Sequence, residues 1–198
     1  MGNPLKQTKQ EFYAKDRKAW RNWLLKNHLT KENCWLTIYK KESNTPSVYY
    51  AEAVEEALCF GWIDSKPNKR DTESFLLFFS KRKPKSVWSA LNKQRIAKLE
   101  AAGLLMPAGI AMIELAKKTG TWTALEAVDS LMYPADFKKA LQKNKTATAF
   151  FEAFPKSAKQ GILQWILSAK KEETRKQRIT ETVSLAAKNI RANQWKPK

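Results

Sequence analysis

The sequence holds few of the residues that build common catalytic and metal centres. One of its 198 residues is histidine, and its two cysteines, Cys34 and Cys59, are well separated in the chain, so no compact set of metal ligands can be assembled. Its six glycines never gather into a phosphate-binding loop. Two cysteines in a chain of this length do not make a disulfide framework. We therefore predict no metal site, no cofactor and free thiols.

Long apolar runs are missing as well. No stretch approaches the roughly 20 apolar residues that a membrane-spanning helix requires. Residues 1–6 contain no apolar core of the kind that a secretory signal has. These absences predict a cytoplasmic protein without a transmembrane segment.

Acidic residues are scarce relative to basic ones. The chain has 37 Lys and Arg against 19 Asp and Glu, which gives a net charge of +18 at pH 7. Residues 66–98 hold ten basic and two acidic residues, and residues 138–198 hold fifteen basic and four acidic ones. Such a charge attracts nucleic acid, anionic membranes or acidic proteins. A lysine-rich solvated surface is the plainer interpretation of the same composition.

The hydrophobic content is high enough for a sizeable core and argues against disorder, since 43% of the residues are hydrophobic. Aromatic and β-branched runs predict strands at residues 34–39, 62–64 and 74–80. Helical spacing, with proline and glycine at segment ends, predicts helices at 12–26, 50–58, 87–102, 107–118, 134–141, 144–154, 155–169 and 173–190. The predicted class is α+β: a small antiparallel sheet of about three strands with flanking helices, then a helical C-terminal half. We place an α+β domain at residues 1–103 and a helical region at 104–198.

Polar and charged residues lie among aromatic ones between positions 62 and 95, and this pattern predicts a candidate binding site. On a helix from residue 87, Trp88, Asn92 and Arg95 fall within one arc about 100° wide that faces the core. A buried guanidinium needs a partner or a water-filled cleft, and Asp64 is the candidate partner. Two interpretations stay open: an Arg95–Asp64 ion pair that fixes the helix to the sheet, or a ligand pocket. The predicted binding residues are Trp62, Asp64, Arg82, Trp88, Asn92 and Arg95.

The C-terminal segment carries a second group of basic residues. Arg175 shares a helix face with apolar Val183 and Ile190, so we predict that it contacts a carboxylate or helix-end carbonyls, with a phosphate or acidic partner as the alternative. The predicted basic surface consists of Lys170, Lys171, Lys176 and Lys188. Because no recognition helix or base-stacking motif accompanies these lysines, they predict at most weak, non-specific binding of nucleic acid or another anionic surface.

Two blocks of the sequence combine aromatic, acidic and basic residues in long, specific phrases. The first block comprises residues 56–65, 79–83 and 86–89 with Asn92 and Arg95, and the second comprises Trp165 with residues 169–171, 173–175 and 178–179. Both blocks resemble the YdeI/OmpD-associated (OmdA, bacteriocin-protection) family, and the resemblance extends from about residue 20 to residue 190. It implies a helical C-terminal region of the YdeI/OmdA type, and a bacterial stress-response protein linked to bacteriocin protection and antimicrobial peptide resistance.

Three functions are compatible with these observations. The first is a non-enzymatic tolerance protein that binds an unknown ligand or protein partner at the aromatic, arginine and aspartate cleft. The second is an enzyme that acts on a small anionic molecule at that cleft, with Asp64 as acid or base. The third is weak non-specific binding to nucleic acid or an anionic surface. A net charge of +18 argues against protection by electrostatic sequestration of cationic peptides.

Overall fold

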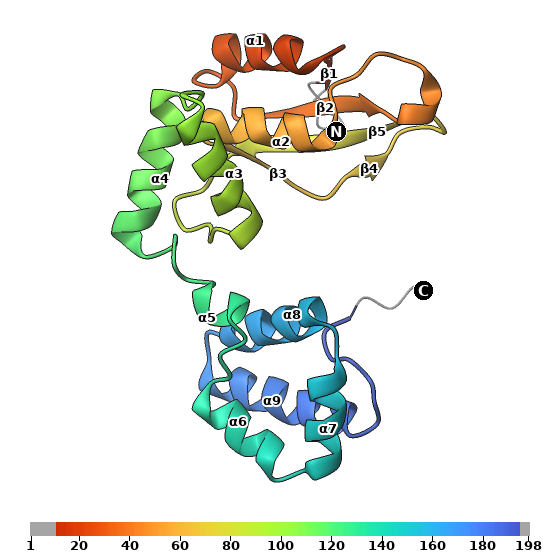
Figure 1. The fold of residues 1–198 in the computed structure, drawn as a ribbon, viewed down its shortest axis with the longest axis vertical. Helices are drawn as coiled ribbons and strands as arrows, with labels where there is room; N and C mark the ends of the chain where they lie inside the picture. The colour runs from red at the N-terminus through yellow and green to blue at the C-terminus, as the bar shows by residue number, and fades with distance from the viewer. Residues whose placement is uncertain (1–10, 195–198) are drawn as a thin grey trace, which may run out of the picture. The chain divides into compact units, whose positions relative to one another are not determined.

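The computed structural model describes residues 11–194. The chain divides into two compact units, Met1–Thr123 and Ala124–Lys198, called here the N-terminal and C-terminal units. The first unit contains a mixed sheet with helices and the second contains helices, which confirms the predicted α+β class and helical C-terminal half (Figure 1). The domain boundary after Gly103 stays a prediction, and residues 104–123 belong to the compact N-terminal unit.

The sheet of the N-terminal unit has five strands in the order β1-β2-β5-β3, with β4 also paired to β5. The three predicted strands correspond to β2, β3 and β5, and they pair antiparallel. The sheet is mixed because the short β1 pairs parallel with β2. The strands are β1 (Glu11–Tyr13), β2 (Asn33–Tyr39), β3 (Trp62–Asp64), β4 (Asn68–Lys69) and β5 (Ser74–Lys81).

The helices of the N-terminal unit match the predicted segments except at the starts of the first one and of the one predicted from residue 87, which begins at Ala90. Residues 12–13 belong to β1, and the helix begins only after Asp16, whose side chain accepts a hydrogen bond from the Ala19 N–H at 2.7 Å. A short 3₁₀ turn, Lys41–Ser43, follows β2. The helices are α1 (Arg17–Asn27), α2 (Tyr50–Cys59), α3 (Ala90–Ala101) and α4 (Pro107–Thr119).

One face of the sheet and the helices α1 and α2 form the core of this unit. Alternate residues of β2 and β5, such as Leu36 and Phe79, are fully buried, as expected for strands with one face in the core. The ring of Trp20 in α1 contacts that of Phe79 in a tilted arrangement, with ring centroids 5.1 Å apart. Its indole N–H donates to the Ala53 carbonyl of α2 at 3.0 Å. That bond satisfies the one polar atom of a large buried side chain.

Helix α4 packs closely against the end of α2. The Met106 N–H donates to the Cys59 carbonyl at 3.0 Å, just before α4 begins. Gly109 lies so close to the same carbonyl that an added Cβ would be 2.2 Å from the Cys59 oxygen. The close approach of the two backbones therefore requires glycine at this position.

This contact predicts opposite effects for one substitution at two helical glycines. Gly109→Ala is expected to destabilise the protein by about 1–3 kcal/mol, because α4 must move away from α2 to admit the methyl group. Gly161→Ala in the helix Lys156–Leu167 meets no atom within 4 Å, and is expected to stabilise the protein by about 0.5–1 kcal/mol through helix propensity. Urea unfolding of both variants measures this, and equal effects would contradict the packing argument.

The C-terminal unit buries a separate core of aromatic and aliphatic side chains, including Phe137, Phe151 and Ile162. The helices that begin after Pro134, Asn144 and Pro155 were predicted from these residues, and Asn144 accepts a hydrogen bond from the Ala147 N–H at 2.9 Å. The short helix Glu126–Asp129 was not predicted. No helix within residues 11–194 is long and apolar enough to cross a membrane. The helices are α5 (Glu126–Asp129), α6 (Ala135–Gln142), α7 (Lys145–Ala153), α8 (Lys156–Leu167) and α9 (Glu172–Ala186).

Candidate binding site around Arg82

Arg82 is the most unusual charged residue of the N-terminal unit. It directly follows β5, and its backbone N–H donates to the Gly61 carbonyl at 2.9 Å. Only 5% of its surface is exposed. The guanidinium lies over the ring of Trp88, with Cζ 3.8 Å from the ring centroid, and its Nη2 donates to the Val87 carbonyl. The loop after β5 thus folds back over Arg82, the residue that follows the strand.

The remaining donors of the Arg82 guanidinium are buried without partners. Nε and Nη1 have no hydrogen-bond acceptor among the described residues. Burial lowers the pKa of Arg82 to about 10, and the negative charge of Asp64 only partly opposes this effect. A buried cation with unsatisfied donors is costly, so Arg82 lacks the acceptors that would compensate its burial.

Asp64 ends β3 and is half-buried. Its Oδ2 accepts a hydrogen bond from the Tyr50 hydroxyl at 2.7 Å. Burial raises the pKa of Tyr50 to about 12, the bond to Asp64 adds to this shift, and the positive charge of Arg95 acts against it. Tyr50 therefore stays a neutral donor, and its hydrogen bond ties Asp64 at the end of β3 to α2.

Asn92 and Arg95 lie on α3, where Arg95 Nη1 donates to Asn92 Oδ1 at 2.9 Å. The predicted Arg95–Asp64 ion pair does not form within residues 11–194. The predicted helical arc was wrong in one respect: α3 begins only at Ala90, so Trp88 precedes it, and the side chains that α3 buries are Ile96 and Leu99. Arg82 occupies the deeply buried position that the helical arc assigned to Arg95.

Trp62 is separated by its contacts from the other predicted site residues. It is 1% exposed, its indole N–H donates to the His28 carbonyl at 3.3 Å, and its ring meets Trp23 edge-on at 5.9 Å. These contacts place it in the core against α1. Tyr50 is hydrogen-bonded to Asp64 and feels the charge of Arg95, and Asp64 in turn acts on the charge of Arg82. The sequence analysis did not single out Tyr50 because nothing in the local pattern relates position 50 to position 64. We call Tyr50, Asp64, Arg82, Trp88, Asn92 and Arg95 the Arg82 cluster.

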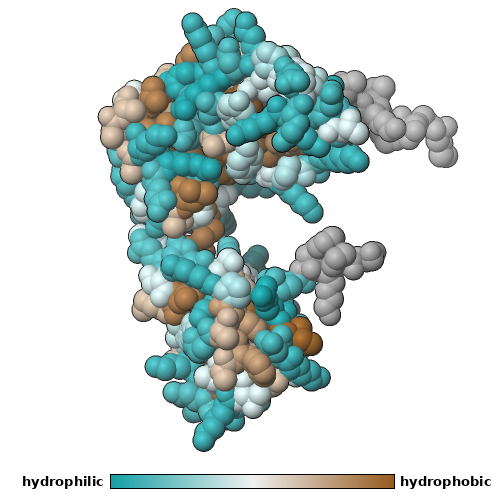
Figure 2. Space-filling view, turned by 45° about the vertical axis from the view of Figure 1, so that its right-hand side comes forward, coloured by the Kyte–Doolittle hydropathy of each residue, from teal (hydrophilic) through white to brown (hydrophobic). Residues whose placement is uncertain are grey.

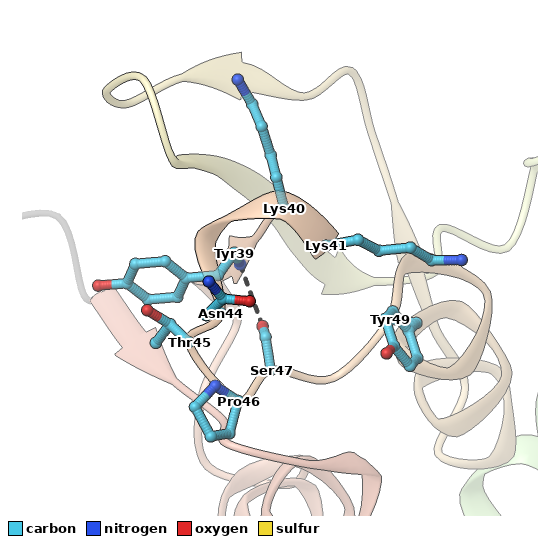
Figure 3. Close-up of a pocket in the computed structure, with 8 residues that line it drawn as sticks. All are labelled: Tyr39, Lys40, Lys41, Asn44, Thr45, Pro46, Ser47 and Tyr49. Atoms are coloured by element: carbon cyan, nitrogen blue, oxygen red, sulfur yellow. Dashed lines mark hydrogen bonds between the residues drawn. The ribbon is translucent and has the colours of Figure 1, made fainter.

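A cavity of about 210 Å³ lies elsewhere in the N-terminal unit, around the 3₁₀ turn after β2 (Figure 3). Its backbone is held by the Tyr39 N–H, which donates to Ser47 Oγ at 3.0 Å. The side chains of Lys40 and Lys41 extend in different directions, and Lys41 lies over the Tyr49 ring, 5.4 Å from its centroid. The two cations therefore do not converge on one ligand, and no residue of the Arg82 cluster lines this cavity.

Metal and thiol chemistry find no support in the described part of the chain. Residues 11–194 contain no group of three or more His, Cys, Asp or Glu that could hold a metal ion. Both cysteines are buried, and burial raises the pKa of Cys34 to about 12 and that of Cys59 to about 11. Neither thiol is therefore prepared as a thiolate nucleophile at neutral pH.

The four lysines of the predicted basic surface are all exposed. Lys170 and Lys171 precede α9, and Lys176 in its second turn pairs with Glu172 at 2.8 Å. Lys188 follows the other end of this 15-residue helix, which spans roughly 20 Å. The lysines thus lie at two ends of α9. Figure 2 shows many other hydrophilic side chains on the visible faces of both units.

The arginines of α9 have structural contacts. Arg175 forms a bidentate pair with Asp136 of α6, with N–O distances of 2.7 and 2.9 Å, which confirms the predicted carboxylate contact. Arg178 donates to the Trp165 carbonyl and to Ser168 Oγ, which satisfies acceptors at the end of α8. The second block of the resemblance thus holds α9 against α6 and α8.

The chain is an α+β protein of two parts: a unit with a sheet and helices, and a helical unit that is held together by its own arginines. A family model matches each part. Residues 12–112, about half of the chain, match a domain of unknown function, DUF8412, and the chain belongs to that family. Residues 130–189 match the OmdA family, described as bacteriocin-protection, YdeI or OmpD-associated, so the chain carries an OmdA domain. No curated protein and no solved structure matches the chain.

These matches confirm the predicted family and assign the two blocks of the resemblance differently. The second block lies within the OmdA match. The first block, which contains Asp64, Arg82 and Arg95, lies within the DUF8412 match instead. The Arg82 cluster therefore lies in the domain whose family description names no function. The description of the OmdA family applies to the C-terminal unit and gives the Arg82 cluster no role.

Proposed function

We propose that this protein is a bacterial tolerance protein that acts by binding a ligand or partner at the Arg82 cluster. The observation that carries the proposal is the Arg82 guanidinium, 95% buried, with Nε and Nη1 unpartnered. Folding alone does not favour such an arrangement, because each buried donor without an acceptor is destabilising. A bound molecule that supplies the acceptors would explain why an arginine occupies this position.

The composition of the cluster supports a binding role. Binding sites combine apolar walls with a few polar groups fixed in place. Here Trp88 and the Val87 carbonyl fix the guanidinium of Arg82, while Tyr50 fixes Asp64. Tyr50, Val87 and Leu91 also expose 38–56% of their surface, which leaves apolar area beside the polar groups.

The description of the OmdA family supplies the physiological part of the proposal, protection against bacteriocins. The net charge of +18 disfavours direct capture of cationic peptides. Protection through a bound ligand or partner inside the cell, rather than through sequestration of the peptide, fits both observations.

A survival assay tests this function. Bacteria that express the full-length protein, its Arg82→Met variant or its Arg191→Gln variant are exposed to a cationic bacteriocin. We expect protection by the wild type and by Arg191→Gln, which removes the same charge at an exposed residue of the other unit, and none by Arg82→Met. Equal protection by all three at equal protein levels would refute the proposal.

A further inference from the structure

We propose that the ligand of the Arg82 cluster carries an oxyanion, a carboxylate or a phosphate, that binds Arg82 Nε or Nη1; this inference rests on the proposed function. An arginine side chain has donors only, so the atoms that satisfy it must be acceptors. A ligand that offers an ammonium or only N–H groups at this point would leave both donors unsatisfied. The missing component of the site is therefore an acceptor.

The charges of the cluster favour a negatively charged acceptor over a neutral one. Among residues 11–123, Arg17 and Arg21 pair with Glu56, and Arg70 pairs with Glu11. Arg82 and Arg95 form no ion pair with any described residue. The arginines that lack a carboxylate are thus the two that belong to the cluster.

Asp64 does not balance both of these arginines. It is the one acid whose charge raises the pKa of Arg82, and its Oδ2 is already bonded to Tyr50. Two guanidinium groups and one carboxylate leave the cluster with a net positive charge. A carboxylate restores neutrality and a phosphate more than offsets the excess charge, whereas a neutral carbonyl or a water molecule would satisfy donors and leave the charge uncompensated.

The donors are held ready for such a group. The contact with Trp88 and the bond to Val87 fix the guanidinium plane of Arg82. Asn92 fixes Arg95, which is only half-buried and can contact the ligand nearer to solvent. Because these contacts already order both side chains, an oxyanion that reaches the donors would lose little of its binding energy to ordering them.

The exposed apolar residues beside the cluster indicate the rest of the ligand. Val87 supplies the carbonyl that holds Arg82, and Leu91 directly precedes Asn92. They expose 38% and 56% of their surface. A ligand with an apolar body and one oxyanion head would cover them, so aryl or alkyl carboxylates and phosphate monoesters are the class that fits.

Calorimetric titration of the full-length protein in low-chloride buffer tests this class with matched probes. Benzoate and phenyl phosphate carry the oxyanion on the same ring, benzyl alcohol is the neutral counterpart and benzylammonium the cationic one. We expect binding of benzoate, phenyl phosphate or both, and none of the other two. The tighter of the first two identifies the oxyanion as a carboxylate or a phosphate.

Three variants locate the binding. Arg82→Met is expected to weaken oxyanion binding about tenfold or more, since it removes charge-assisted donors. Asp64→Asn removes the competing negative charge while it keeps an acceptor for Tyr50, so it is expected to tighten binding about threefold. Arg191→Gln should leave the affinity unchanged. A purely structural role of Arg82 and Asp64 would not produce opposite changes in affinity.

The possible results separate this inference from the proposed function. The oxyanion class is overturned if benzyl alcohol or benzylammonium binds as tightly as benzoate and this binding depends on Arg82. It is also overturned if no probe binds although survival depends on Arg82. In both cases the binding function stands. If survival is indifferent to Arg82→Met while benzoate binding is lost, the ligand class stands and the tolerance function fails. Oxyanion binding that is unchanged in Arg82→Met overturns the site itself.

Discussion

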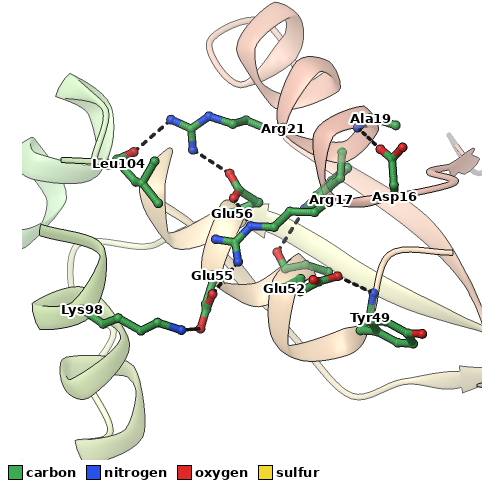
Figure 4. A network of polar contacts seen from close by, with 12 residues as sticks. Asp16, Arg17, Ala19, Arg21, Tyr49, Glu52, Glu55, Glu56, Lys98 and Leu104 are labelled. Atoms are coloured by element: carbon green, nitrogen blue, oxygen red, sulfur yellow. Dashed lines mark hydrogen bonds and ion pairs between the residues drawn. The ribbon is translucent and has the colours of Figure 1, made fainter. Parts of the chain in front are cut away.

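Replacement of Glu56 by glutamine is expected to destabilise the N-terminal unit by about 3 kcal/mol, within the range for breaking a buried ion pair. Glu56 is only 2% exposed, and its two oxygens accept from Arg17 Nε at 2.5 Å and Arg21 Nη1 at 2.7 Å. Both bonds join α1 to α2 (Figure 4). Glutamine keeps the shape but turns an N–H group or a neutral oxygen towards two guanidinium groups, so the remaining cations lose their compensation.

The same substitution at a surface ion pair is the matched control. Glu114 pairs with Lys117 one turn away on α4 at 2.9 Å, and both side chains are more than half exposed. Glu114→Gln should therefore cost about 0.5 kcal/mol or less. Six of the eight tryptophans lie in the N-terminal unit, so urea unfolding followed by tryptophan fluorescence reports mainly on it. Equal midpoints for the two variants would show that Glu56 contributes no more than a surface residue.

The Glu56 network also supports the candidate site. Glu55 accepts from Arg17 at 2.9 Å and from Lys98 of α3 at 3.3 Å, and Arg21 Nη2 donates to the Leu104 carbonyl at 3.0 Å. The network thus fastens α3, which carries Asn92 and Arg95, to α2, which carries Tyr50. Loss of Glu56 should weaken ligand binding only as far as it loosens this attachment, unlike loss of Arg82.

The elements of the fold that the sequence predicted well are those whose signal is local. The β-branched and aromatic run of β2 and the proline that begins α4 each mark an element within a few residues. The first predicted helix began too early because the aromatic residues Phe12 and Tyr13 continue the helical spacing, whereas pairing with β2 makes them a strand. A three-residue strand is too short to show its own alternation, so only its partner defines it.

The candidate site was predictable in its residue types and not in its pairing. Five of its six members were named from the sequence, because aromatic, acidic and basic residues alternate where a core would be aliphatic. Which arginine is buried depends on where α3 begins and on how the loop after β5 returns over Trp88, and both are non-local contacts. The burial of Glu56 on α2 was missed for the same reason, since its partners lie 35 and 39 residues away.

Replacement of Arg82 by methionine is expected to stabilise the N-terminal unit by about 1–3 kcal/mol, although it removes a hydrogen bond. The pKa of Arg82 is lowered to about 10 because its charge is buried, and a shift of this size corresponds to about 3 kcal/mol. Methionine fills a similar volume against Trp88 without donors to satisfy. The Val87 carbonyl, which loses the Arg82 donor, belongs to a residue that is 38% exposed, so water can replace the bond.

The matched control is Arg21→Met, in the same unit and with the same change of side chain. Arg21 pairs with buried Glu56, so its loss removes a satisfied partner and should destabilise the unit. Urea unfolding should therefore move the two midpoints in opposite directions. A residue whose removal improves stability is retained for another reason, and the proposed acceptor-bearing ligand would supply that reason. If Arg82→Met is instead as destabilising as Arg21→Met, Arg82 is a structural residue, and its unpaired donors no longer argue for a bound molecule.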